Sequence, residues 1–317
     1  MPAPALTTVA LGDDVASALQ SVPASGGVGQ IVGPDGRNLL IGKAANLRRW
    51  AATHFGLGPP PKPGVRPRTN LSGLAVAIAF AETASDFGQR LRYERLMARY
   101  VPAEKRKDLK PPSFLALDPH ERFPRVIVRD EAPAGLPLYG PFRDRAAAVR
   151  ARDLLYKRFQ LRPCDYTFEP DPGLPLGLGC LYAQVRTCAA PCLARVGEEA
   201  YRALAGEAAR FLAEPDARGD ALPVWIRAVA GQRALVAERT PSGWELFALR
   251  EGHVVDDASA DDAALEQALG ALDWDAAAAA DDRAWVTAWL HAPKRKGAWH
   301  ALPAADLARA VRDASAR

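Results

Sequence analysis

The cysteines of this 317-residue chain constrain its fold more than any other feature, because all four lie in one short stretch. Cysteines that only fill a core would be scattered, whereas thiolates that share a metal must converge. The spacing, C-x15-C-x7-C-x3-C, is too wide for the paired knuckles of a zinc ribbon, but it suits one centre of zinc or of iron and sulfur. The sequence therefore predicts a metal site formed by four cysteines: Cys164, Cys180, Cys188 and Cys192.

Length and charge bound the class of protein. A chain of this length can form two domains with cores of their own, and a smaller cysteine-bearing module between them. It has no apolar run long enough to cross a membrane and no secretory-type N-terminus, so we expect a cytoplasmic protein with reduced thiols. Residues 37–110 hold about fifteen basic and five acidic side chains, which indicates a polyanionic partner such as DNA, or else a solvated surface in an arginine-rich composition.

Apolar periodicity and turn residues predict an α+β fold. Residues 28–32 and 39–41, separated by Pro34, Asp35 and Gly36, indicate a β-hairpin. A strand is expected after Phe123, in the segment RVIVRD. Helices are expected after the cap residue Asn46 and at four further places: residues 71–80, 85–100, 145–159 and 196–212. Pro191 would start the last of these, which would place Cys192 at its N-terminus.

The region after Pro215 changes character. The segments VWIRAVA, RALVAER and WELFALREGHVV predict a three-stranded meander, followed by alanine-rich helices that end with ADLARAVRDAS. Four parts are expected: a lead-in (1–22), a domain with a small sheet flanked by helices (23–135), a helical cysteine module (136–213) and an α+β C-terminal domain (221–317).

Two segments carry a family resemblance. YGPFRDRAAAVRARDLLYKRFQLRPC and CLYAQVRTCAAPCLARVGEEAYRALAGEAARFL resemble the N-terminal half of the UvrC family of excinucleases and of its shorter relatives. The resemblance covers residues 26–212. It implies that the four cysteines are the ligands of a [4Fe-4S] cluster, with zinc as the alternative.

The segment GVGQIVGPDGRNLLIGKAANLRRWAATHF is similar to the GIY-YIG nuclease domain that opens this family. That nuclease uses two tyrosines, an arginine and a glutamate around one divalent metal. In the frame set by Gly42-Lys43-Ala44, these positions fall on residues of other types: Gly29, Leu40, Trp50 and Tyr93.

Each substitution removes a function that phosphodiester hydrolysis requires. The reaction needs a group that activates water, a cation for the transition state and a carboxylate for the metal. Arg49 and Glu94 adjoin two of the positions, but one step along a helix turns a side chain by about 100°. We therefore expect a degenerate, inactive domain. The alternative is an active nuclease that nicks one strand with Mg²⁺ or Mn²⁺.

The cations of this domain remain candidates for DNA contacts, because phosphate recognition needs only positive charges in register with the backbone. The candidates are Lys43, Arg48, Arg49, Arg99 and Lys105. Solvated surface residues are the alternative interpretation. The sequence thus predicts a DNA-binding protein of the excision-repair type.

The C-terminal domain carries two further groups of residues. Asp256, Asp257, Asp261 and Asp262 could form a two-metal site, but their DDASADDAA context favours loop and capping roles. Three tryptophans, Trp285, Trp289 and Trp299, favour packing over base stacking. A third hypothesis makes this acidic domain the contact for a repair-protein partner.

Overall fold

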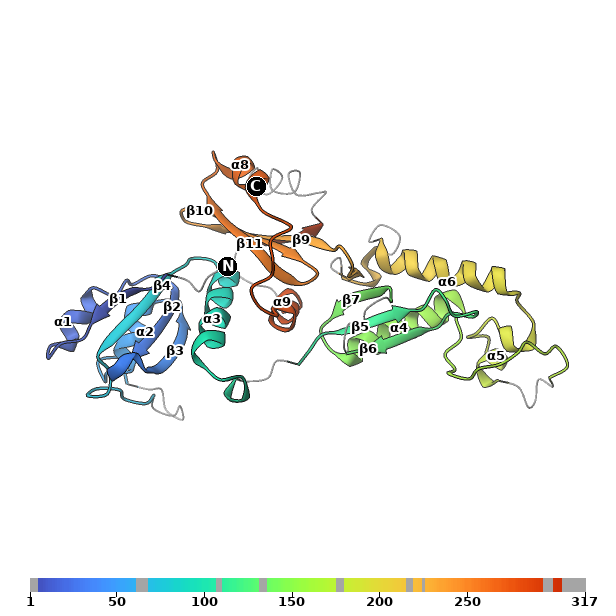
Figure 1. The fold of residues 1–317 in the computed structure, drawn as a ribbon, viewed down its shortest axis with the longest axis horizontal. Coiled ribbons are helices and arrows are strands. Elements are labelled where there is room, and N and C mark those ends of the chain that lie inside the picture. Colours follow the sequence, from blue (N-terminus) through green and yellow to red (C-terminus); the bar gives the residue numbers. More distant parts are fainter. Residues whose placement is uncertain are drawn as a thin grey trace.

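The computed structural model describes residues 5–60, 68–106, 110–130, 136–174, 180–214, 219–223, 226–292 and 299–303. Within them the chain forms three four-stranded sheets with helices packed against them, which confirms the α+β class. Figure 1 shows an elongated arrangement: the first sheet lies at one end, the cysteine segment around α5 (Leu181–Gln184) at the other, and the C-terminal sheet above the middle. None of the described helices is both long and apolar enough to span a bilayer.

The first sheet is antiparallel throughout, in the order β1-β4-β2-β3. Its strands are β1 (Thr7–Ala10), β4 (Ala77–Glu82), β2 (Gly27–Val32) and β3 (Asn38–Ala44). The predicted hairpin is confirmed as β2 and β3, joined by the turn η1 (Pro34–Gly36). Gly36 there has a φ of 72°, a left-handed conformation that glycine adopts without strain.

Helix α2 (Leu47–Thr53) packs against β2 and β3, and α1 (Val15–Gln20) packs against α2. The predicted cap of α2 is confirmed, since the side chain of Asn46 accepts a hydrogen bond from the backbone N–H of Arg49 at 2.8 Å. The buried face of α2 includes Leu47 and Trp50, which therefore face the core.

The helix predicted over residues 71–80 is wrong. Residues 77–82 instead form β4, the strand that lies between β1 and β2. Alanine favours a helix in isolation, but here pairing on both sides satisfies the backbone, with Ala79 opposite both Thr8 and Gln30. Tertiary pairing overrides local propensity in this segment.

The helix predicted next is confirmed as α3 (Asp86–Tyr100), capped by Ser85, whose hydroxyl accepts from Gly88 N at 2.9 Å. This helix contacts both β2 and β3 and also β9 of the C-terminal sheet. The side chain of Phe87 is fully buried, with ring centroids 4.8 Å from Phe247 and 5.0 Å from Trp285. The helix thus shares a hydrophobic core with the C-terminal region.

The middle sheet has the order β6-β5-β7-β8. Its strands are β5 (Ser113–Leu117), β6 (Val126–Arg129), β7 (Leu138–Phe142) and β8 (Arg227–Ala228). Two helices complete its core, both close to their predicted bounds: α4 (Arg145–Phe159) and α6 (Glu198–Ala213). The boundary expected at residue 135 falls between β6 and β7, inside this sheet.

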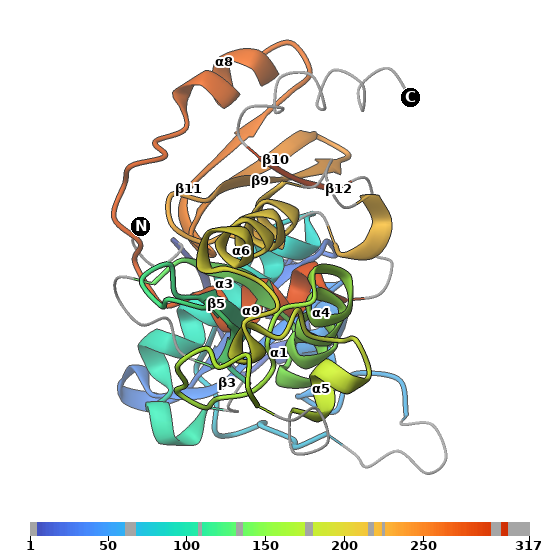
Figure 2. The same ribbon diagram turned by 90° about the vertical axis from the view of Figure 1, so that its right-hand side faces the viewer.

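The C-terminal sheet has the order β11-β10-β9-β12. Its strands are β9 (Arg233–Thr240), β10 (Gly243–Arg250), β11 (His253–Ala260) and β12 (Trp299–Pro303). Helix α9 (Arg283–Leu290) packs on one face together with α3, and α8 (Leu265–Ala271) packs on the other (Figure 2).

A three-stranded meander is present, but one of the three segments predicted to form it is wrong. The segment VWIRAVA contributes β8 to the middle sheet, where Ala228 lies opposite Tyr139. The third strand of the meander is instead β11, because the chain turns at Glu251 and Gly252, both with positive φ. The helix expected in ADLARAVRDAS lies outside the described residues.

Candidate metal centre and nucleic-acid interface

The loop that carries Cys164 is held by a buried arginine. Arg162 donates from Nε to Phe123 O at 2.8 Å and from Nη1 to Tyr166 O at 2.8 Å. Its backbone N–H donates to the hydroxyl of Tyr201 at 2.7 Å, which connects the loop to α6. The start of the cysteine segment is therefore fixed to the middle sheet and its helices.

The other three cysteines lie in short turns. Cys180 caps α5, and Cys192 lies in the turn η3 (Pro191–Leu193). The prediction that Cys192 begins the long helix is wrong, because α6 starts only after Gly197 and Pro191 begins η3 instead. Cys180 and Cys192 pack against one small apolar cluster, and Cys188 is buried.

The thiols interact electrostatically with one another. Burial, together with the negative charges of Cys180, Cys164 and Cys192, raises the pKa of Cys188 to about 11, and the hydrogen bond from Ala190 N opposes this shift. Burial likewise raises the pKa of Cys192, with the charges of Cys180 and Cys164 adding to it. The thiols are thus close enough for the ionisation of one to oppose that of the others.

The backbone around Cys188 turns its N–H groups toward sulfur. Ala190 N donates to the Sγ of Cys188 at 3.3 Å, and the backbone N–H groups of Cys192 and Leu193 lower the pKa of Cys192. Ala190 and Ala194 adopt left-handed φ values of 56° and 51°, which is costly for residues other than glycine. Such turns form concave nests of N–H groups that stabilise anionic sulfur.

The four cysteines offer the soft sulfur donors that zinc sites and iron-sulfur clusters both use. Zinc would draw four sulfurs to about 2.3 Å from a single centre. Among the described residues, no group of three or more His, Cys, Asp or Glu side chains is arranged to hold a metal ion. Sulfur donors with a backbone N–H directed at Cys188 are compatible with zinc and with an iron-sulfur cluster.

The four residues that the resemblance aligns with nuclease groups lie on β2, β3, α2 and α3. Gly29 and Gly42 are directly opposite each other in the hairpin, and the indole of Trp50 covers both. A Cβ on Gly42 would lie 2.6 Å from the Trp50 ring, and one on Gly29 would lie still closer, at 2.4 Å. The ring therefore takes the space that a side chain at position 29 would need.

We expect Gly29→Ala to destabilise the protein by about 1–3 kcal/mol, because the added methyl group overlaps the indole. Urea denaturation of Gly29→Ala, Trp50→Ala and the double variant would measure the coupling between the two sites. If the changes in the free energy of unfolding of the two single variants add up to that of the double variant, the packing of Trp50 does not require a glycine at position 29.

Arg49 and Glu94, the two residues that adjoin aligned positions, lie in different surroundings. Glu94 forms an ion pair with Arg90 at 2.5 Å, and burial raises its pKa while the charges of Arg90 and Lys43 lower it. Arg49 is exposed on α2. Leu40 and Tyr93 are half-buried and carry no carboxylate or guanidinium.

The cations predicted to contact DNA do not share one environment: some are engaged within the protein and others line a hollow. Arg48 is a structural tether: its Nε donates to Val22 O at 2.8 Å and its Nη2 to Gln20 O at 3.0 Å. Arg99 lies over the ring of Tyr100, 5.2 Å from its centroid, and Lys105 ends the turn η2 (Ala103–Lys105).

Lys43 and Arg49 line a common hollow of about 290 Å³ together with Arg68. Arg68 is not among the cations predicted to contact DNA. It does lie in a basic run of the sequence, RPRTN. Its Nη1 donates to the hydroxyl of Thr53 at 3.1 Å. Three cations and no carboxylate line the hollow among the described residues, so it would attract an anion.

The C-terminal acids do not form a two-metal site in the described structure. Asp261 accepts from Ala264 N at 2.8 Å in a capping role, and Asp262 pairs with Arg239 and Trp244. Asp256 and Asp257 lie within β11, not in a loop as expected.

The tryptophan prediction is confirmed for Trp285 and Trp289, which are both buried in the core shared with α3. The side chain of Trp299 lies outside the described part of the structure.

The middle sheet and the cysteine segment are similar in sequence to known proteins. Residues 113–211 match the family model of the UvrC/Cho excinuclease middle domain, which covers β5, β6, β7, α4 and most of α6. The match includes all four cysteines. The middle sheet and the cysteine segment are thus similar to an excinuclease middle domain.

The particular relatives are proteins named UvrABC system protein C, and the chain resembles them. That of Aromatoleum aromaticum is 30% identical over 203 residues, 63% of this chain and 32% of its own length. That of Kocuria rhizophila is 30% identical over 230 residues, 70% of this chain and 31% of its own length. The chain thus spans about a third of the curated relatives it matches. No solved structure gives a significant match.

Proposed function

We propose that this chain is a DNA-binding protein of the excision-repair type, with a nuclease-like domain that has lost its catalytic groups and a cysteine module that holds a [4Fe-4S] cluster. The resemblance to UvrABC system protein C supports the repair context. The observation that carries the loss of catalysis is the indole of Trp50, which fills the space above Gly29 and Gly42.

The hollow lined by Lys43, Arg49 and Arg68 supports DNA binding through the backbone. Phosphate contacts are electrostatic and independent of sequence, so they survive the loss of catalytic residues. The four cysteines would hold the cluster, which would supply a cationic core that fixes the loops between α4 and α6. The chain's own contribution is to shield Cys188 from water and to direct N–H groups at the sulfurs.

Mobility-shift assays on duplex, nicked and branched DNA at graded salt test this function. Salt-sensitive binding without cleavage in Mg²⁺ or Mn²⁺ is the expected result. Metal-dependent nicking would instead establish the active nuclease, and no binding to any of the three would refute the proposal.

A double variant, Arg49→Gln with Arg68→Gln, tests whether the hollow is the contact. We expect it to weaken binding to all DNA sequences about tenfold and to reduce the slope of log K against log salt by about 2, because each arginine neutralises one phosphate. Arg210→Gln is the matched control, since Arg210 is an exposed arginine in the last turn of α6. Equal slopes in all three proteins would show that DNA binds elsewhere.

A further inference from the structure

The cysteine segment exposes most of the large apolar side chains found on the surface of the described residues. Five of them lie between residues 166 and 185: Tyr166, Leu174, Leu181, Tyr182 and Val185. Three of these belong to one turn, since Leu181 and Tyr182 begin α5 and Val185 is its C-terminal cap. Leu181 is 66% exposed, Val185 57% and Tyr182 43%. A surface that gathers apolar side chains in this way is typical of a site that another molecule covers.

The fold holds these three side chains outward. Ala183, on the opposite side of the turn, is buried in the small apolar cluster beside the cysteines. Thr187 closes the turn with two hydrogen bonds to Tyr182 O, from its backbone N–H at 2.9 Å and from its hydroxyl at 3.2 Å. The face formed by Leu181, Tyr182 and Val185 is therefore fixed at the surface, because turning it inward would expose Ala183 and break both bonds.

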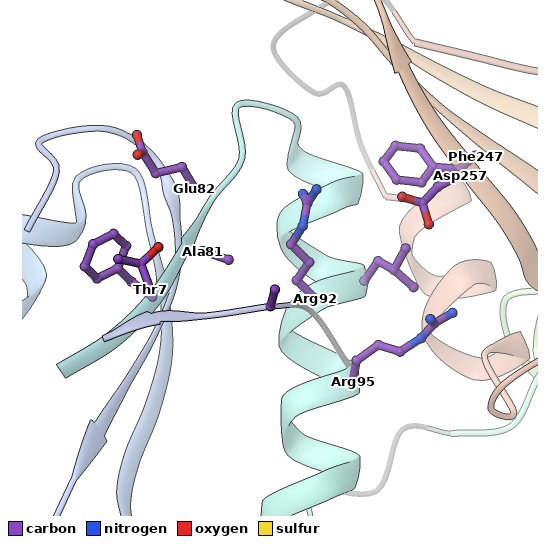
Figure 3. Close-up of a pocket in the computed structure, with 10 residues that line it drawn as sticks. Thr7, Ala81, Glu82, Arg92, Arg95, Phe247 and Asp257 are labelled. Atoms are coloured by element: carbon purple, nitrogen blue, oxygen red, sulfur yellow. The ribbon is translucent and has the colours of Figure 1, made fainter. Parts of the chain in front are cut away.

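The charge around this turn is positive. Residues 180–197 contain two arginines, Arg186 and Arg195, and no acidic residue. Both arginines are exposed, and neither has an ion-pair partner among the described residues. By contrast, Arg92 and Arg95, which lie on α3 beside the C-terminal region (Figure 3), pair with carboxylates of that region at 3.4 Å and 3.8 Å. The positive charge of the cysteine segment is thus available to an anionic partner, whereas that of α3 is used within the protein.

The combination of apolar and cationic side chains distinguishes between partners. A second copy of the chain that docked symmetrically through this turn would bring Arg186 and Arg195 toward the same arginines of the partner, and like charges oppose such a contact. DNA satisfies both kinds of side chain, because its phosphates attract arginine and its unstacked bases pack on aromatic and apolar groups. A fully stacked duplex hides the faces of its bases, so this surface is suited to DNA in which stacking is interrupted.

We propose that residues 181–185 form a wedge that contacts unstacked bases where a DNA duplex is interrupted, while Arg186, next to the wedge, contacts an adjoining phosphate. The inference rests on the proposed DNA-binding function and adds to it a preference for interrupted duplexes. Figure 1 shows α5 at the end of the molecule opposite the first sheet, whose domain carries the cationic hollow that Arg49 lines. The two contacts are therefore separate: the hollow holds the backbone of any DNA, and the wedge selects its structure.

Fluorescence anisotropy of the full-length protein with an intact duplex, the same duplex with a gap, and a single strand tests this preference. The wild type is expected to bind the gapped DNA about tenfold more tightly than the intact duplex, because stacking of a base on the wedge adds to the backbone contacts. The double variant Leu181→Ala with Tyr182→Ala is expected to lose the preference and to keep its affinity for the intact duplex. Leu74→Ala is the matched control and should keep both, because Leu74 is 52% exposed but belongs to the first domain. All these positions are exposed, so equal urea denaturation of the three proteins is expected.

A fluorescent adenine analogue placed in the gap reports the contact itself, because stacking quenches its emission. The wild type and Tyr182→Phe, which keeps the ring, are expected to quench the emission, whereas Tyr182→Ala is not.

Equal affinity of the wild type for intact and gapped DNA, or a preference that the double variant keeps, would overturn this inference and leave the DNA-binding function in place. No binding to any of the three DNAs would refute that function and the inference with it. Dimerisation that the double variant loses, without a preference for gapped DNA, would assign the wedge to a second copy of the chain.

Discussion

The Cys188→Ser variant is expected to lose most of the iron and sulfide of the wild-type protein, and with them the visible absorption of an iron-sulfur cluster. Cys188 is the buried thiol, and the charges of the other three cysteines all act on it. Serine keeps the size of the side chain but replaces a soft sulfur ligand with a hard oxygen that does not ionise near neutral pH.

Iron, sulfide and zinc analysis of anaerobically purified protein measures this outcome. Thr187→Ser is the matched control, because it alters the neighbouring residue, whose hydroxyl donates to Tyr182 O at 3.2 Å, without removing sulfur. One equivalent of zinc per chain and no sulfide in the wild type would replace the cluster by a zinc site. If the wild type and Cys188→Ser contain equal amounts of iron, Cys188 is not a ligand of the cluster.

Capping residues and apolar periodicity predict an element correctly where neighbouring residues in the sequence determine its structure. Helix α4 begins after Asp144, which caps Ala147 N at 2.8 Å, and its bounds were predicted without error. By contrast, residues 77–82 became a strand because of two partners remote in sequence, which no local pattern reveals.

Other features of the candidate sites could not be predicted, because they depend on how strands pair and on which helix packs over them. Gly29 and Gly42 are paired across the hairpin, and Trp50 covers them from a helix, so positions 29 and 50, which the resemblance aligns with two nuclease groups, are structurally linked. Their residue types alone show only that each is substituted. The left-handed turn at Ala190 is likewise invisible in the sequence, since alanine does not favour it.

The packing of α3 against the C-terminal sheet was also unexpected, and it places a buried carboxylate at the N-terminus of the helix. Glu238 on β9 is 6% exposed and accepts a hydrogen bond from Phe87 N at 2.7 Å. Burial, together with the negative charges of Asp86 and Glu245, raises its pKa to about 7. Hydrogen bonds from Phe87 N and the Ser85 side chain oppose this shift.

This shift makes the interface sensitive to pH. From pH 4.5, the ordinary value for a glutamate, to about pH 7, the unfolded chain has lost this proton while the folded chain keeps it. The contribution of Glu238 to the free energy of unfolding therefore falls as the pH rises through this window. Above it the deficit reaches roughly 3 kcal/mol, since one pKa unit corresponds to about 1.4 kcal/mol.

The Glu238→Gln variant is therefore expected to be more stable than the wild type by about 2–3 kcal/mol at pH 8, and by about 1 kcal/mol or less at pH 5. Glutamine keeps an oxygen that can accept from Phe87 N, but it has no charge to bury. Urea denaturation at pH 5, 6, 7 and 8 measures the difference. Glu199→Gln, at an exposed position on α6, serves as the control and should show no such trend. Equal stability of wild type and Glu238→Gln at pH 8 would mean that water reaches this carboxylate and that the C-terminal sheet is not closed over α3.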